Sequence, residues 1–150
     1  MALGSSGRIG VEAIVATFGN VGLDKTRANL LRILGFFKDW PLIGSGSRAP
    51  MGGRARQARH VHGRDGLGDI PGRFAKGRAS LFRNGVKLII KSVLSNRINS
   101  IVATGPLTDI ARAIREAPAM LNNLDEIVIM GGAVFVDGNV TPHAEFNFHC

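Results

Sequence analysis

The last twenty residues of the chain are dense in side chains that suit sugar binding. Asn139, Glu145 and Asn147 lie in a loop-like segment after an apolar stretch that ends in Met130-Gly131-Gly132. An asparagine offers a donor and an acceptor to neighbouring hydroxyl groups, and a glutamate offers two acceptor oxygens. These residue types at this spacing therefore favour recognition of a small polyhydroxylated ligand such as a sugar.

Four apolar stretches have the pattern of strands that would position this loop. Apolar runs without polar alternation are typical of strands that are buried on both faces of a parallel sheet. The predicted strands cover residues 11–18, 41–44, 98–104 and 126–130.

A helix is predicted between the first two of these strands. Asp24 is expected to be its N-cap, because an aspartate side chain can accept hydrogen bonds from the first free backbone amides. The helix runs to about Phe37, and Ala28, Leu31 and Leu34 share one face at helical spacing.

Two further helices are predicted later in the chain. Apolar residues recur with helical period over residues 84–96. Pro106 suits the first turn of the next helix, and Thr104 is expected to cap that helix. Asp109 is expected only to interact with the positive end of the helix dipole.

Strands and helices alternate, and this order predicts an α/β fold with a Rossmann-like, mostly parallel sheet flanked by helices. In such sheets ligands bind beyond the carboxyl ends of the strands. Three predicted strands end in Gly19-Asn20, Thr104-Gly105 and Met130-Gly131-Gly132. We therefore expect these three ends to converge on one site beside the C-terminal loop.

Residues 45–80 form a Gly- and Arg-rich segment without periodicity, which predicts a long loop. This segment carries much of the net charge of +8, but it has few aromatic side chains on which bases could stack. A solvated insertion is therefore favoured over a nucleic-acid site. The single cysteine, Cys150, excludes an intrachain disulfide and fits a reducing cytoplasm, and no apolar run is long enough to span a membrane.

Five motifs follow one another along the chain. They are Ala16-Thr17-Phe18-Gly19-Asn20-Val21, His60-Val61-His62-Gly63, residues 103–111, residues 127–132 and Ala144-Glu145-Phe146-Asn147. In this order they resemble the inosine-uridine preferring nucleoside hydrolase family. The resemblance implies a calcium-dependent enzyme that hydrolyses the N-glycosidic bond of purine or pyrimidine ribonucleosides to ribose and free base.

The resemblance also implies roles for individual residues. Met130 would pack against the bound nucleoside, and His62 would lie near the nucleobase and hydrogen-bond to it as it leaves. Thr104 would give its backbone carbonyl to calcium. Four residues are implied to contact the ribose: Asn20, Asn139, Glu145 and Asn147.

The chain departs from the family pattern at both ends. It lacks the Asp-x-Asp-x-x-x-Asp-Asp motif that opens family members, and it stops at Phe148-His149-Cys150, before a segment with a further calcium-binding Asp and an active-site His. We therefore expect residues 1–150 to be a partial nucleoside hydrolase domain without the first strand and the C-terminal part. No catalytic residue is assigned. Alone, the chain is expected to bind calcium weakly or not at all and to turn over nucleosides negligibly.

Other expectations drawn from the family are a cytoplasmic location, a role in purine and pyrimidine salvage, and a possible homo-oligomer. Two alternatives stay open. One is a catalytically inactive nucleoside- or ribose-binding module, and the other is a basic nucleic-acid-binding protein that uses the arginines of residues 48–83. Because an absent first strand would expose an unpaired sheet edge, we also expect the isolated chain to be aggregation-prone or partly disordered.

Overall fold

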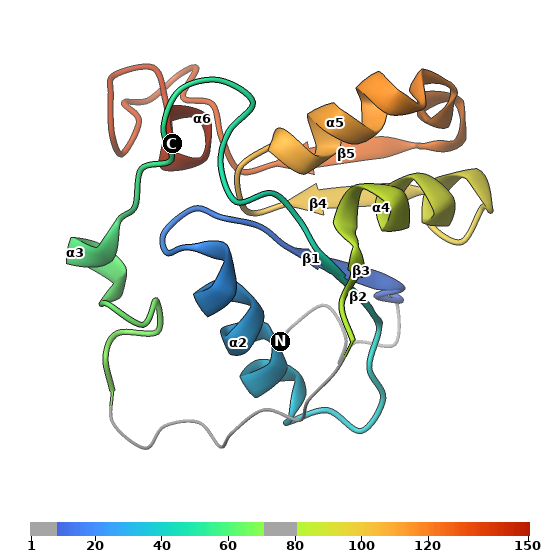
Figure 1. Cartoon of the computed structure of the whole chain (residues 1–150). Coiled ribbons are helices and arrows are strands. Elements are labelled where there is room, and N and C mark those ends of the chain that lie inside the picture. Colours follow the sequence, from blue (N-terminus) through green and yellow to red (C-terminus); the bar gives the residue numbers. More distant parts are fainter. Residues whose placement is uncertain (1–8, 71–80) are drawn as a thin grey trace.

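The computed structural model describes residues 9–70 and 81–150, which form parallel strands with helices packed against them (Figure 1). The strands are β1 (Ala13–Ala16), β2 (Leu42–Ser45), β3 (Arg83–Asn84), β4 (Ser100–Ala103) and β5 (Glu126–Ile129). The helices are α2 (Leu23–Leu34), α3 (Arg59–His62), α4 (Gly85–Leu94), α5 (Thr108–Glu116), the 3-10 helix η1 (Pro118–Asn123) and α6 (Phe146–His149). This alternation confirms the predicted α/β fold.

The strands form two separate parallel sheets, β1-β2-β3 and β4-β5. In the first sheet Ala13 lies opposite Leu42, and in the second Ser100 lies opposite Glu126. No strand pairing among the described residues joins β1 to β4. The sequence predicts one mostly parallel sheet, whereas the structure divides it into two parts with a free edge on β1 and another on β4.

The most deeply buried part of the molecule lies between α4, α5 and η1. Val93, Ala113 and Met120 contribute one fully buried side chain from each of these helices. Ile101 of β4 packs against this cluster, because alternate residues of a strand point to opposite faces. Helix α4 also packs on β1 and β2, so it links the two sheets.

Helix α2 confirms the first predicted helix but begins differently. Gly22 is its N-cap, and no side chain forms a capping hydrogen bond. Asp24 lies in the first turn instead, where its carboxylate accepts a hydrogen bond of 2.7 Å from the guanidinium of Arg48. This hydrogen bond holds the pKa of Asp24 below its ordinary value. The prediction that Asp24 caps the helix is therefore wrong, because Arg48 engages its carboxylate.

The buried face of α2 also differs from the predicted one. Ala28 is exposed, and Asn29 is buried next to it. Asn29 Nδ2 donates a hydrogen bond of 2.8 Å to the backbone carbonyl of Asp65. A polar residue can be buried here because a carbonyl from a distant segment satisfies its amide, and this partner is not visible in the spacing of apolar residues.

Helices α4 and α5 confirm the two later predictions, with one correction. Asn84 caps α4, since its side chain accepts a hydrogen bond of 3.0 Å from the backbone amide of Lys87. Helix α5 begins at Thr108 and has no side-chain cap. The expected cap by Thr104 is wrong, because Thr104 lies four residues before the first helical residue.

The predicted loop over residues 45–80 is only partly confirmed. Its described part contains the short helix α3, and residues 71–80 lie outside the described residues. The two-residue strand β3 follows and pairs with the end of β2. A strand of two residues has no recognisable alternation, so the sequence pattern does not reveal it. No helix in the described ranges has both the length and the apolar character needed to cross a membrane.

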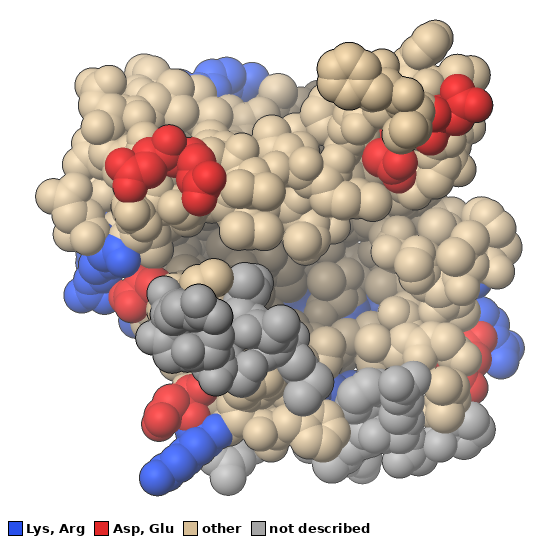
Figure 2. All heavy atoms as spheres, turned by 180° about the vertical axis from the view of Figure 1, so that it is seen from behind, with Lys and Arg blue, Asp and Glu red and all other residues tan. Residues whose placement is uncertain are grey.

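One face of the second sheet is open. The buried cluster beneath α4 and α5 lies on one side of β4, and Val102 points to the other side with 54% of its surface exposed. Figure 2 shows the side of the molecule opposite to Figure 1, where much of the upper surface is uncharged and a hollow separates it from the lower part. The prediction that residues 98–104 are buried on both faces is wrong for Val102, because no described element covers that side.

Candidate functional site

Asn147 ties the C-terminal segment to the ends of two strands. Its side-chain Nδ2 donates to the backbone carbonyl of Thr104, 3.1 Å away, and to that of Met130, 2.9 Å away. Thr104 directly follows β4 and Met130 directly follows β5. One amide therefore spans the carboxyl end of the second sheet. Met130 is partly exposed, so it is not a core residue.

Some polar groups of Asn139 and Glu145 form hydrogen bonds that shape the same segment, and others have no partner among the described residues. Asn139 Oδ1 accepts a hydrogen bond of 2.9 Å from the backbone amide of Phe146. The backbone amide of Glu145 donates to the carbonyl of Gly131 over 2.8 Å. Within the described residues, the Glu145 carboxylate and the Asn139 Nδ2 have no hydrogen-bond partner. Both groups are therefore available to a ligand.

Two glycines allow this segment to fold back so closely. The ring of Phe148 lies against Gly131, where a Cβ atom would overlap it. A Cβ atom on Gly138 would likewise overlap the carbonyl of Ala144. The Phe148 ring and the Ala144 carbonyl can approach these two positions only because glycine has no side chain.

The carboxyl end of β1 lies beside the start of α5. A Cβ on Gly105 would lie 3.1 Å from Thr17 Cγ2, and a Cβ on Gly19 would lie 3.2 Å from Pro106 Cδ. Together with the contacts of Asn147, this confirms that the three strand ends converge. Asn20 follows directly; its side chain is exposed, and its carbonyl accepts a hydrogen bond from the backbone of Ala58.

A buried carboxylate fixes the loop after β2 to these strand ends. Asp109 accepts hydrogen bonds from the backbone amide of Ser47, at 2.9 Å, and from the Ser47 hydroxyl, at 2.7 Å. Both residues are buried. The prediction that Asp109 only interacts with the helix dipole is therefore wrong. Its partner is 62 positions away in the sequence, so the helical position of Asp109 could not reveal it.

His62 lies on α3, and within the described residues no hydrogen bond links its side chain to the C-terminal segment. The loop after α3 is closed by Asp69, whose carboxylate accepts hydrogen bonds from the backbone amides of Arg64 and Asp65 at 3.0 and 2.9 Å. These amides lower the pKa of Asp69. The structure thus brings Thr104, Met130 and Asn147 together and leaves His62 on a separate element.

Arg56 is a neighbour of the C-terminal segment that the sequence did not indicate. Its guanidinium contacts Nε2 of His149 on α6. In Figure 1 the segment after β2 passes close to α6 before it reaches α3. Since 93 positions separate Arg56 from His149, composition showed only a solvated basic segment.

The described residues alone do not fit a calcium ion. Calcium takes six to eight oxygen ligands, and several of them are usually carboxylates. In residues 9–70 and 81–150 no group of three or more His, Cys, Asp or Glu side chains is placed to hold a metal. The carbonyl of Thr104, the one ligand implied by the sequence, already accepts a hydrogen bond from Asn147.

Comparison with protein families gives one match over the whole chain. Residues 1–150 match the model of the inosine-uridine preferring nucleoside hydrolase family. Over 148 residues the chain is 37% identical to a pyrimidine-specific ribonucleoside hydrolase, RihA, of Salmonella schwarzengrund, covering 97% of this chain and 47% of that protein. It is 32% identical over 142 residues to a non-specific ribonucleoside hydrolase, RihC, of Salmonella paratyphi B. This match covers 93% of this chain and 45% of that protein. The chain thus spans about half the length of the curated relatives it matches.

Solved structures show the same similarity. The chain matches a purine-preferring ribonucleoside hydrolase from Gardnerella vaginalis with a TM-score of 0.85 and 29% identity, covering 97% of this chain and 48% of that one. It matches a plant nucleoside hydrolase, PpNRh1, with a TM-score of 0.82 and 33% identity. This match covers 93% of this chain and 45% of that one.

Proposed function

Because the chain belongs to the inosine-uridine preferring nucleoside hydrolase family, we propose that residues 131–150 bind the ribose of a ribonucleoside. The reaction proposed for the whole protein is hydrolysis of the N-glycosidic bond, with release of ribose and a free purine or pyrimidine base. One observation carries the proposal. Asn147 anchors the segment at the strand ends, while the Glu145 carboxylate and the Asn139 amide nitrogen have no described partner.

The free groups have complementary roles toward a sugar. The two oxygens of Glu145 accept hydrogen bonds from neighbouring ribose hydroxyls, and Asn139 Nδ2 donates one. Asn147 uses its nitrogen to hold two carbonyls, so its Oδ1 remains an acceptor. Asn20, exposed at the end of β1, supplies a further amide from the first sheet.

Ribose held in this way is prepared for bond cleavage. Glycosidic bonds break through a transition state with positive charge on the sugar ring. Fixing the ring in one orientation removes part of the entropic barrier for this step. Met130, partly exposed beside Asn147, offers an apolar surface to the nucleoside. We assign His62 to the base side, where its imidazole would donate a proton or a hydrogen bond to the departing base.

Ligand binding by the full chain tests the proposal. We would measure binding of uridine, inosine and ribose by titration calorimetry, with 2′-deoxyuridine and uracil as comparisons. The ribonucleosides and ribose are expected to bind, and the deoxynucleoside and the free base are expected to bind more weakly. Glu145→Gln and Asn147→Ala should each reduce ribose affinity by about tenfold, since each removes hydrogen bonds to the sugar.

Phe135→Ala is the matched control, because Phe135 lies in the same segment and its side chain is almost fully exposed. This variant should bind ribose as the wild type does. Equal affinity of wild type, Glu145→Gln and Asn147→Ala for ribose would refute the assignment of the sugar site.

A second candidate is a ribose-binding module without catalytic activity. The lack of a carboxylate cluster among the described residues favours it for this chain alone. It predicts ribose binding that a chelator leaves unchanged, without release of base from uridine or inosine. Base release that needs added calcium would instead favour the hydrolase.

Calcium, location and assembly are proposals drawn from the family resemblance. If calcium binds, Thr104 supplies one carbonyl, and the remaining ligands come from outside the described residues. A cytoplasmic protein of purine and pyrimidine salvage fits the single cysteine and the proposed substrates. A homo-oligomer would be recognised by light scattering coupled to size-exclusion chromatography.

A further inference from the structure

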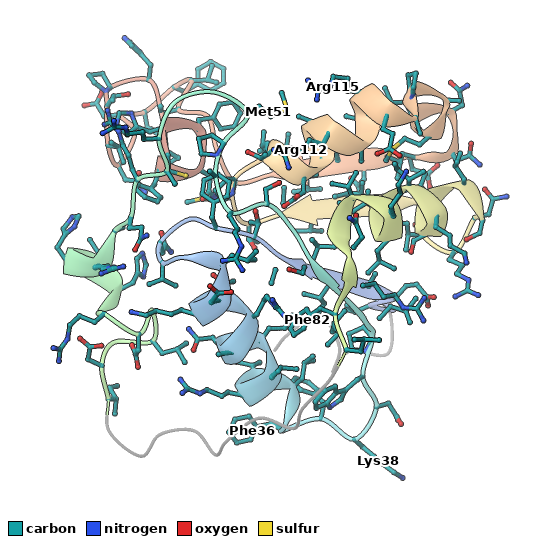
Figure 3. All side chains as sticks on the ribbon, viewed as in Figure 1. Phe36, Lys38, Met51, Phe82, Arg112 and Arg115 are labelled. Carbon is teal, nitrogen blue, oxygen red and sulfur yellow. The ribbon has the colours of Figure 1, made fainter. Side chains whose placement is uncertain are left out.

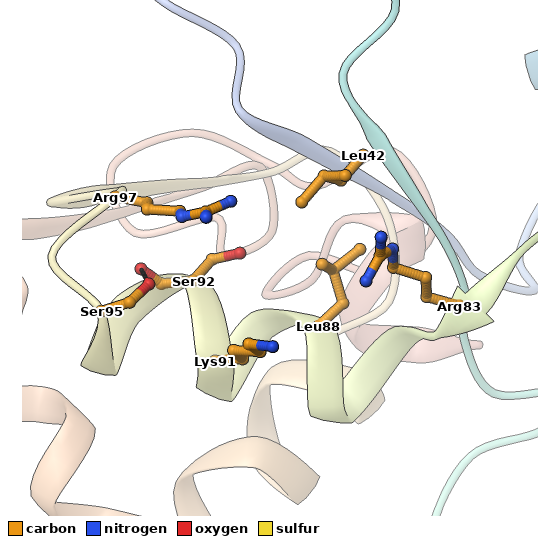
Figure 4. Close-up of a pocket in the computed structure, with 7 residues that line it drawn as sticks. All are labelled: Leu42, Arg83, Leu88, Lys91, Ser92, Ser95 and Arg97. Carbon is orange, nitrogen blue, oxygen red and sulfur yellow. Dashed lines mark hydrogen bonds between the residues drawn. The ribbon is translucent and has the colours of Figure 1, made fainter.

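A small cavity lies at the opposite end of the strands from the C-terminal segment. Leu42 begins β2 and Arg97 precedes β4, so the cavity lies near the amino ends of the strands (Figure 4). Its volume is about 210 Å³. The cavity is lined by Leu42, Arg83, Leu88, Lys91, Ser92, Ser95 and Arg97. It is therefore separate from the proposed ribose site.

Three cationic side chains surround this cavity. Arg97 pairs with Glu12, with 3.2 Å between Nη1 and Oε1. Arg83 and Lys91 have no ion-pair partner within the described residues. Lys87, one turn from Lys91 on α4, differs because it pairs with Glu116. The cavity thus keeps two positive charges that the described part of the protein does not neutralise.

The hydroxyl of Ser92 and an apolar wall complete the site. Ser92 is only 2% exposed, and Figure 4 shows its hydroxyl directed toward the space between Arg97 and the two leucines. A serine hydroxyl both donates and accepts hydrogen bonds, so it can serve an anion that the cations attract. Leu42 and Leu88 form an apolar wall on the other side.

We propose that this cavity binds a small phosphorylated metabolite, with its phosphate between Arg83 and Lys91 and its carbon skeleton against Leu42 and Leu88. Guanidinium and ammonium groups form strong, charge-assisted hydrogen bonds with phosphate oxygens. Pockets for drug-sized ligands usually have volumes of about 300–1,000 Å³. A cavity of about 210 Å³ therefore selects a ligand the size of a triose or pentose phosphate.

Titration of the full chain with glycerol 3-phosphate tests this proposal. Inorganic phosphate and glycerol serve as separate arms, because they present the anion and the carbon skeleton alone. Glycerol 3-phosphate is expected to bind most tightly, inorganic phosphate more weakly and glycerol not at all. Binding should weaken as salt concentration rises, since salt screens the attraction between exposed charges.

Three variants distinguish binding in this cavity from attraction of the ligand to the positive charge of the whole protein. Arg83→Gln and Lys91→Gln should each weaken glycerol 3-phosphate binding by about tenfold, the loss expected for one charge-assisted contact. Arg112→Gln removes the same charge from α5, outside the cavity, and should leave binding unchanged (Figure 3). Equal losses in all three variants, or unchanged binding in both cavity variants, would overturn the proposal. Inorganic phosphate that binds as tightly as glycerol 3-phosphate would overturn the role of the leucines.

The proposal stands apart from the proposed ribose site. Asn147→Ala should leave glycerol 3-phosphate binding unchanged, and glycerol 3-phosphate should not displace ribose. If Asn147→Ala abolished binding of both ligands, the phosphate would lie in the C-terminal segment and the cavity assignment would be wrong. Arg83 and Lys91 are both exposed, so their substitution leaves the packed core intact.

Discussion

The layer of α4, α5 and η1 and the C-terminal segment 131–150 are held in place by different interactions. In the layer, Val93, Ala113 and Met120 are fully buried against one another. In the segment no residue after Gly131 is buried, and hydrogen bonds of individual side chains and amides hold the chain. Apolar burial therefore stabilises the first region, and scattered polar contacts stabilise the second.

This difference separates the scaffold from the proposed ligand-binding surface. A buried apolar side chain contributes roughly 1.5–3 kcal/mol to stability, whereas a typical hydrogen bond contributes about 0.5–1.5 kcal/mol net. A region with few buried contacts opens locally at little cost. Stability and ligand binding should thus respond to substitutions in different regions.

The largest expected effect is on the stability of the layer. Met120→Ala removes a fully buried side chain where α4, α5 and η1 meet, and it should lower the free energy of unfolding by about 2–5 kcal/mol. Urea unfolding followed by circular dichroism measures this change. In the segment, Phe135→Ala should change stability by less than about 0.5 kcal/mol, because 97% of the Phe135 surface is exposed. A similar loss in both variants would show that the segment is packed as firmly as the layer.

The next effect concerns a buried polar contact of the scaffold. Asp109→Ala leaves the amide and hydroxyl of Ser47 without their acceptor, and it should lower the free energy of unfolding by about 1–3 kcal/mol. Ser47→Ala removes the hydroxyl alone and should cost less. In the double variant the two losses should not add, because both residues belong to one interaction. Additive losses would mean that the two residues stabilise the fold independently.

A smaller stability effect, combined with a loss of binding, is expected in the segment. Gly131→Ala forces the ring of Phe148 away, because the added Cβ would overlap it, and 55% of the Phe148 surface is exposed. Stability should fall by less than about 1 kcal/mol, while ribose affinity should fall several-fold because α6 and Asn147 shift. Gly132→Ala is the matched control, since no atom lies within 4 Å of its added Cβ. Equal ribose affinity of these two variants would contradict a link between Phe148 and the sugar site.

The sequence predicted those parts of the fold that depend on local patterns. Four strands and three helices were recognisable because apolar spacing and chain order carry that information. The N-cap of α2 was not recognisable, because Asp24 pairs with Arg48, which comes from a distant loop. The division into two sheets was also missed, since strand pairing depends on neighbours in space and leaves no trace within β1 or β4 themselves.

The candidate site, like the fold, was predictable only where local sequence pattern and topology determine it. Convergence of the strand ends follows from parallel topology, and the contacts of Asn147 with Thr104 and Met130 confirm it. The pairs Asp109–Ser47 and Arg56–His149 join residues far apart in sequence and were not predictable from spacing. The functional roles of Asn20, Asn139, Glu145 and His62 stay predictions until ligand binding is measured.

The smallest expected effect concerns the loop after α3, which like the segment is held by polar contacts. The amides of Arg64 and Asp65 donate to the Asp69 carboxylate and lower its pKa below the ordinary value of 3.8. The contribution of Asp69 to loop order is therefore fully present above pH 3.8 and is lost as pH falls through the lowered folded value. Exchange of the Gly66 and Gly68 amide protons, measured by NMR, should accelerate relative to the intrinsic rate over this acid range.

Asp69→Asn isolates the charge from the backbone geometry. Asp69 has a positive φ of 52°, a conformation that asparagine also adopts readily. The variant does not titrate, and its one side-chain oxygen can accept from only one of the two amides, because in the wild type each amide donates to a different carboxylate oxygen. In the variant, the Gly66 and Gly68 amide protons should exchange faster than in the wild type above pH 3.8. Relative to the intrinsic rate, their exchange should not accelerate further in acid. Should wild type and variant respond to acid alike, the order of this loop would depend on other groups, and Asp69 would only mark its turn.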